Sequence, residues 1–280
     1  MDRDELLKRC RLPVMPHVAM RIMKISSDPN ARVEDLQHAI SVDQTLTSRI
    51  LAIANSSFYG VRRDIDTISE AIFILGFNAV KNIALAVSMK ELYGTGTLSQ
   101  KLWEHAIGVS SAAPIVLAKV NRRGIQAEEA VVGGLLHDIG KAVLLHGLPD
   151  IYPSVLNRVI KERRPCLSLE REVLGFDHQD AGAMLFEQWR LPALLTKVVQ
   201  YHHRCQSIDD EGVKTLCEVI RYADFICTRL GIGYREPMPD LCDDEEERLI
   251  ASFGLSIDDI EEIISLFRER FISEKLALVG

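Results

Sequence analysis

The spacing of apolar residues constrains this chain more than any other feature. Apolar side chains recur every three to four positions through nearly the whole sequence, as at Val18, Ile22 and Ile25. Runs that alternate apolar with polar residues and are rich in Val, Ile and Thr are scarce. A helix brings every third or fourth residue to one face, whereas a β-strand needs a repeat of two. We therefore expect an all-α protein.

A short stretch of glycine and hydroxyl residues interrupts the helical pattern. Residues 93–99 read YGTGTLS and separate two long helical segments. Glycines in such a setting favour a turn. We therefore predict two lobes: an amino-terminal helical bundle of roughly five helices over residues 1–96, and a second helical lobe with a carboxy-terminal helical extension over residues 97–280.

Local signals set several helix boundaries. In the first lobe, the segment 41–43 and Ser69 have residue types that cap helices, and Gly76 marks a stop or a close helix contact. In the second lobe, helices are predicted over residues 100–121, 127–146, 148–163, 167–174, 178–189, 192–202 and 213–230. The acidic segment 240–247 is expected to start another helix, and an amphipathic helix is predicted over 257–276.

Composition and charge exclude several classes of protein. No apolar run reaches membrane-spanning length, the amino terminus lacks a secretory signal, and the six cysteines form no C-x-x-C pair. The formal charge is −7, and the basic residues are dispersed. We therefore expect a cytoplasmic protein that binds neither nucleic acid nor a membrane.

Histidine is concentrated in the second lobe, which holds six of the eight in the chain. Five of these histidines and two aspartates lie in segments that can converge: His105, His137, His178, His202, His203, Asp138 and Asp224. Imidazole and carboxylate together suit iron, manganese or zinc, and the lack of thiolate argues against a structural zinc site. We expect an open divalent metal site that favours iron or manganese, with a binuclear arrangement as one option.

The adjacency of His137 and Asp138 restricts how the site can be built. Neighbouring residues on a helix point about a hundred degrees apart. Both can therefore bind one metal only at a kinked or tightly packed helix, or they must bridge two metals. Gly140 follows closely and permits another backbone to approach.

These motifs resemble those of the HD phosphohydrolase superfamily. The sequence GLLHDIGK at 134–141 is preceded by WEH at 103–105 and followed by GFDH at 175–178, YHH at 201–203 and YAD at 222–224. In the first lobe, LPVMP at 12–16, DQTLT at 43–47, ANSSFYG at 54–60 and AIFILG at 71–76 are similar to the HDOD signalling module. The resemblance covers roughly residues 10–232. It implies that the second lobe is HD-domain-like.

The resemblance also implies roles for individual residues. Positions that match His105, His137, Asp138 and Asp224 ligate metal in the superfamily. The HD-GYP branch, which hydrolyses cyclic di-GMP, adds ligands matching His178, His202 and His203, and a lysine matching Lys141 contacts the substrate phosphate. A Gly-Tyr-Pro signature should follow the histidine pair, but RCQS stands at 204–207. HDOD modules are usually regarded as non-catalytic regulators.

Three functions remain open from the sequence. The leading hypothesis is a signal-transduction module that acts through a signalling protein partner, gated by a nucleotide or metal. The alternative is a metal-dependent phosphohydrolase acting on a nucleotide or cyclic dinucleotide, with Lys141 as a catalytic residue. A third is a redox or oxygen sensor with a di-iron site. The competing interpretations are structural: His137 and Asp138 as a packing pair, and Lys141 as a solvated surface lysine.

Overall fold

All regular structure in the described residues is helical. The computed structural model describes residues 12–26, 28, 30–55, 63–120, 122, 124–233 and 244–279. Within these ranges there is no strand. The expected all-α fold is therefore confirmed.

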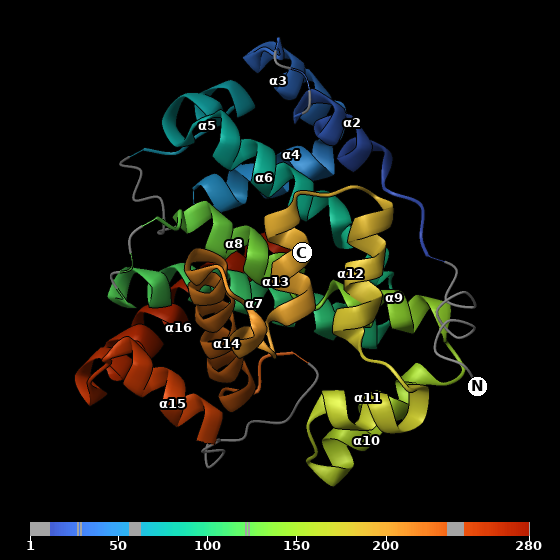
Figure 1. Cartoon of the computed structure of the whole chain (residues 1–280). Coiled ribbons are helices and arrows are strands. Elements are labelled where there is room, and N and C mark those ends of the chain that lie inside the picture. The colour runs from blue at the N-terminus through green and yellow to red at the C-terminus, as the bar shows by residue number, and fades with distance from the viewer. Residues whose placement is uncertain are drawn as a thin grey trace.

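The first lobe consists of short helices that pack against one another (Figure 1). Its elements are α2 (His17–Ser26), α3 (Val33–Ser41), α4 (Gln44–Ala54), α5 (Ile68–Leu75), α6 (Phe77–Ser88) and the 3-10 helix η1 (Met89–Tyr93). Ile22, Ile40 and Ile83 are fully buried there. The apolar repeat that predicted these helices thus forms the inner faces of the lobe.

Three of the predicted helix boundaries in this lobe can be compared directly. Asp43 caps α4, because its carboxylate accepts a hydrogen bond from the Leu46 amide at 2.9 Å. The assignment of Ser69 as the cap of α5 was wrong. Thr67 is the cap, and its hydroxyl accepts from the Glu70 amide at 3.1 Å. Gly76 ends α5 with a φ of +92°, a conformation that glycine adopts without strain.

The second lobe is organised around one long helix, α7. Its helices are α7 (Thr97–Val120), α8 (Ala127–Leu136), α9 (Ile139–Gly147), α10 (Tyr152–Glu162), α11 (Cys166–Leu174), α12 (His178–Gln188), α13 (Ala193–Tyr201), α14 (Glu211–Arg229), α15 (Asp244–Phe253) and α16 (Ile257–Val279), with η2 at Cys205–Ser207. Helices α8, α14 and α16 pack against α7. Figure 1 shows α9, α12 and α13 beside this centre and the α10–α11 pair at the edge.

The lobes share an interface, since α6 packs against α8, and α16 contacts both α4 and α7. Ile263 and Phe267 of α16 are fully buried. The division of the chain at residue 96 stays a prediction, although α7 begins at Thr97. Among the described residues, no helix combines the length and apolar character that crossing a membrane requires.

Candidate metal centre

The helix predicted over residues 127–146 is in fact broken at the His-Asp pair. Helix α8 ends at Leu136 and α9 starts at Ile139, and Asp138 between them has φ −99° and ψ 14°. The break turns both side chains to one side, so that His137 Nε2 lies 3.4 Å from Asp138 Oδ2. A straight helix would have separated them, which is why this local departure builds the site.

Gly140 lets helix α12 approach the break closely. A Cβ at position 140 would overlap the His178 carbonyl and would lie 2.9 Å from the Gly182 amide nitrogen. This contact places the first residue of α12 at the cluster, with His178 Nε2 3.3 Å from Asp138 Oδ1. The close approach expected at Gly140 is therefore present.

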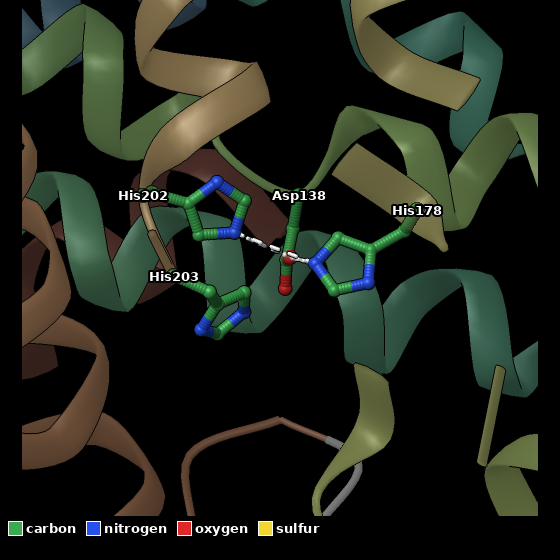
Figure 2. Close-up of side chains that lie close together, drawn as sticks. All are labelled: Asp138, His178, His202 and His203. Atoms are coloured by element: carbon green, nitrogen blue, oxygen red, sulfur yellow. Dashed lines mark hydrogen bonds and ion pairs between the residues drawn. The ribbon is translucent and has the colours of Figure 1, made fainter. Parts of the chain in front are cut away.

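The end of α13 and two further helices supply the remaining ligand candidates. His202 Nε2 lies 3.6 Å from Asp138 Oδ1 and 3.4 Å from His178 Nε2. Figure 2 shows Asp138 between His178 and His202, with His203 turned toward the same point. From α7, His105 Nε2 lies 3.7 Å from Asp138 Oδ2, and it also lies 3.1 Å from the Asp224 Oδ1 of α14. All seven predicted residues thus meet around one polar centre.

The cluster contains two groups that share Asp138. The first holds Asp138, His178, His202 and His203, and the second holds His105, His137 and Asp138; within each, the ligand atoms lie within 4.8 Å of one another. Asp224 adjoins the second group through its contact with His105. Since the two oxygens of Asp138 face different groups, the arrangement suits one or two ions.

Four of the imidazoles have a hydrogen-bond acceptor close to their Nδ1 atom, the ring nitrogen that does not face Asp138 or Asp224. His137 Nδ1 lies 2.7 Å from the Gly134 carbonyl oxygen, and His105 Nδ1 lies 3.2 Å from the Ile232 carbonyl oxygen. His202 Nδ1 lies 3.0 Å from the Val199 carbonyl. The fourth, His178 Nδ1, lies 2.6 Å from the Glu170 carboxylate. An acceptor at Nδ1 fixes the orientation of the ring so that Nε2 faces the cluster, as in metal-binding histidines.

Several atoms of the cluster have no hydrogen-bond partner among the described residues. They are His137 Nε2, Asp138 Oδ1 and both ring nitrogens of His203, all of them buried. The His203 backbone is fixed, because its amide donates to Gln179 Oε1 at 2.9 Å. Buried polar atoms normally find a partner, so this set fits a cation better than a purely structural hydrogen-bonded cluster.

The carboxylates of the cluster stay ionised. Burial alone would raise the pKa of Asp138, but the Lys141 ammonium and His137 hold that pKa well below its usual value. For Asp224 burial is again outweighed, chiefly by the hydrogen bond and charge of His105, and its pKa is also well below the usual value. Ionised carboxylates are the form that binds metal.

Two of the imidazoles stay neutral. Burial lowers the pKa of His202 to about 4, although Asp138 opposes the change. Burial and the charge of Arg221 place the pKa of His203 well below its usual value. In His137, burial would lower the pKa, but the neighbouring Asp138 raises it. Neutral imidazole is the metal-binding form, so His202 and His203 are prepared for that role.

Lys141 lies inside the cluster and not on the surface. Its side chain is 4% exposed, and its Nζ lies 2.5 Å from Asp138 Oδ2. The interpretation of Lys141 as a solvated surface lysine is therefore wrong. Its catalytic role toward a phosphate stays a prediction.

Sequence reasoning missed Glu170 and Arg221, which contact the ligand candidates from outside. Glu170 is fully buried behind His178. Arg221 Nη1 lies 2.7 Å from Asp224 Oδ2, three residues along the same helix. That helical spacing was a usable signal for Arg221. Nothing in the sequence distinguishes Glu170 from the other glutamates around it.

The chain resembles several known proteins. A Treponema pallidum (strain Nichols) protein named only as uncharacterized is 24% identical over 214 residues, which are 76% of this chain and 41% of that protein. The chain thus spans less than half the length of this relative.

Three solved structures share the fold. An HDOD domain protein of unknown function from Geobacter sulfurreducens has 22% identity and a TM-score of 0.74, over 99% of this chain and 98% of the other. A protein from Shewanella amazonensis SB2B, provisionally described as a metal-dependent phosphohydrolase, has 20% identity and a TM-score of 0.71, over 99% and 97%. A Marinobacter aquaeolei VT8 protein, provisionally described as a signal transduction protein, has 21% identity and a TM-score of 0.71, over 96% and 59%.

The family assignment comes from the sequence itself. The model of the HDOD domain matches residues 12–205, which include most of the first lobe and most of the histidine cluster. The chain therefore belongs to the HDOD domain family.

Proposed function

We propose that this protein is a cytoplasmic signalling module that binds a divalent metal in its second lobe and regulates a protein partner. The family supports the signalling role, and the histidine cluster supports the metal. The structural relative that is described as a signal transduction protein is consistent with this assignment.

One observation carries the proposal of metal binding. Four histidines keep Nδ1 against an acceptor and direct Nε2 toward Asp138 or Asp224. A packing role would need only one hydrogen bond per ring, and it would not require all four Nε2 atoms to converge on the same two carboxylates. Nitrogen and carboxylate ligands without thiolate favour iron or manganese. The two groups that share Asp138 favour a binuclear site.

Burial favours regulation over catalysis. His137, His178 and His202 are fully buried, and Asp138 is 1% exposed. A phosphodiester would have to reach the metal through this covering, whereas a small ion needs a much narrower path. A buried ion stabilises one arrangement of the surrounding helices, and a partner that binds the same arrangement would then respond to the ion.

A second candidate function is hydrolysis of a nucleotide or cyclic dinucleotide. It is favoured by Lys141, whose ammonium lies at the cluster and could contact a phosphate. The structural relative described as a metal-dependent phosphohydrolase is consistent with it. A divalent metal in this site would polarise a phosphoryl group. The residues RCQS at 204–207, where the HD-GYP signature is expected, weigh against cyclic di-GMP as the substrate.

Metal analysis of the purified protein tests the proposal. We expect one or two equivalents of iron or manganese in protein purified without added metal, and loss of that metal in His137→Gln. His146→Gln is the matched control, because His146 lies on α9 with an exposed side chain. Metal-free wild-type protein that takes up neither ion on titration would contradict the metal site.

A second experiment separates the regulatory function from the hydrolytic one. The metal-loaded protein is incubated with cyclic di-GMP, with nucleotides and with a generic phosphodiester. The regulatory proposal expects no turnover, together with a metal-dependent change in thermal stability. Turnover that Lys141→Met abolishes while metal stays bound would replace it with the hydrolase.

A further inference from the structure

The carboxylate of Glu170 joins the edge of the second lobe to the histidine cluster. Glu170 lies on α11, which pairs with α10 at the periphery of the lobe (Figure 1). Its side chain is fully buried. Taking a carboxylate out of water is costly, so it is found buried only where several donors surround it.

Four donors surround this carboxylate. One oxygen accepts from the Tyr152 hydroxyl at 2.5 Å and from the Cys166 thiol at 3.3 Å. The other accepts from the His178 amide at 3.1 Å and lies 2.6 Å from His178 Nδ1. Glu170 thus holds together the start of α10, its own helix and the start of α12.

His178 carries this connection into the metal centre. Its Nδ1 faces Glu170, while Nε2 on the far side of the same ring lies 3.3 Å from Asp138 Oδ1 and 3.4 Å from His202 Nε2. The ring is rigid, so the direction that Glu170 imposes at one nitrogen also fixes the other. The proton held at Nδ1 leaves a lone pair at Nε2.

We propose that Glu170 is a positioning residue that sets the tautomer and direction of His178 and thereby couples metal binding to the docking of the α10–α11 pair. This inference rests on the proposed metal site. A cation at Nε2 withdraws electron density from the ring and makes the Nδ1 proton a stronger donor to Glu170. Metal therefore tightens the α10–α11 pair, and by linkage a ligand that holds this pair in place tightens the metal.

Cys166, Glu170 and His178 also have ligand atoms close enough to hold an ion among themselves. The contacts argue against that use, because both carboxylate oxygens already accept hydrogen bonds, one from the Tyr152 hydroxyl and the Cys166 thiol and the other from the His178 amide. The group is better described as a hydrogen-bonded support for His178.

The test compares Glu170→Gln with Glu172→Gln in the full chain. Both residues lie on α11, but Glu172 is exposed and pairs with Arg158 and Arg164 at the surface. We expect Glu170→Gln to weaken Mn²⁺ binding, measured by competition with a chelator, by about 10–100-fold. Glu172→Gln should stay within about twofold of wild type. Retention of full Mn²⁺ affinity in a folded Glu170→Gln would overturn the inference.

Two further measurements distinguish positioning from general support. In metal-free protein, long-range ¹H–¹⁵N spectra should place the His178 proton on Nδ1, and Glu170→Gln should change that pattern. A wild-type His178 that carries its proton on Nε2 alone overturns the inference, even in a protein that binds no metal. Hydrogen exchange in α10 and α11 should slow when Mn²⁺ is added to wild type. An equal slowing in Glu170→Gln would contradict the coupling.

A milder variant covers the case in which Glu170→Gln fails to fold. Tyr152→Phe keeps the carboxylate and removes one donor to it. We expect a smaller loss of Mn²⁺ affinity and faster exchange in α10. Unchanged values for both would count against the coupling. If wild type binds no metal, the proposed function is contradicted. The tautomer measurement uses metal-free protein, so it would still test whether Glu170 positions His178.

Discussion

Arg221 holds Asp224 by one carboxylate oxygen and leaves the other oxygen to the histidine cluster. The guanidinium lies 2.7 Å from Asp224 Oδ2, while Asp224 Oδ1 lies 3.1 Å from His105 Nε2. The same guanidinium contacts Glu245 of α15 at 2.8 Å and lies over the Phe225 ring. Asp224 is therefore oriented by a residue that also contacts helix α15.

Replacement of Arg221 should destabilise the protein. In Arg221→Gln, Asp224 and Glu245 lose a largely buried cationic partner, and we expect the free energy of unfolding to fall by about 2–3 kcal/mol. Urea denaturation of the metal-free protein measures this change. Arg158→Gln is the control, since solvent screens its exposed ion pairs and their loss should change the free energy of unfolding little. Equal losses in the two variants would show that the Arg221 contacts are worth no more than a surface pair.

Gly140 should tolerate no side chain. In Gly140→Ala the new methyl group would overlap the His178 carbonyl, so α9 and α12 would have to separate. We expect a loss of about 3 kcal/mol or more in unfolding free energy. Circular dichroism during thermal denaturation measures it. Gly96→Ala, whose Cβ would meet only Ser99 Oγ at 3.8 Å, should stay close to wild type. A stable Gly140→Ala that still binds metal would show that the close approach is not required.

The sequence was enough to predict the fold class and the members of the cluster. The apolar repeat reflects which residues face the core. It therefore predicts helices even where the predicted helix ends are wrong by a few residues. The convergence of His105, His137, His178 and His202 on Asp138, with Asp224 beside His105, also followed from residue types and family motifs. Most of these residues lie on different helices, so only the types of their side chains and the family resemblance indicated that they would lie close together.

The sequence could not give the break at His137 and Asp138 or the cap of α5. The apolar pattern continues through residues 137 and 138, and no proline marks the break. The turn forms where α12 packs against Gly140, and that contact depends on the tertiary fold. Thr67 and Ser69 are equally good caps by residue type, and the fold decides between them. Glu170 was missed for a similar reason, since its burial depends on the packing of α10, α11 and α12. Residues 56–60, which complete the ANSSFYG motif of the resemblance, lie outside the described residues.

The metal-free protein should lose stability as pH falls below neutral. The folded pKa of His202 is about 4, against 6.5 for an ordinary imidazole, so between these values the unfolded state binds a proton that the folded state does not. The resulting loss is at most about 1.4 kcal/mol per pH unit. The folded pKa of His137 is raised, so its contribution is complete below about pH 6.5 and declines only at higher pH.

Urea denaturation at pH 7 and pH 5 checks this expectation. His202→Gln removes one of the two imidazoles with a lowered pKa, so its stability should change less over this range than that of wild type. A variant with the same pH dependence as wild type would assign the effect to other groups. The two carboxylates act in a lower range, since their folded pKa values lie well below the usual value. Their stabilising contribution is lost only as pH falls below about 4.

Lys141 should compete with metal for Asp138. Its ammonium lies 2.5 Å from Asp138 Oδ2, the oxygen that faces His105 and His137. A divalent ion beside that oxygen would meet the repulsion of the lysine charge at short range. In Lys141→Met we therefore expect Mn²⁺ to bind on the order of tenfold more tightly, measured by chelator competition.

The stability of the same variant should depend on metal. Without metal, Lys141→Met leaves the buried Asp138 carboxylate without its nearest cation, and the free energy of unfolding should fall by about 3 kcal/mol. Saturating Mn²⁺ should restore most of that loss, because the ion replaces the missing charge. Urea denaturation in EDTA and in Mn²⁺ gives both values. A loss that is the same in both conditions, with unchanged Mn²⁺ affinity, would mean that Lys141 serves the protein scaffold and not the metal centre.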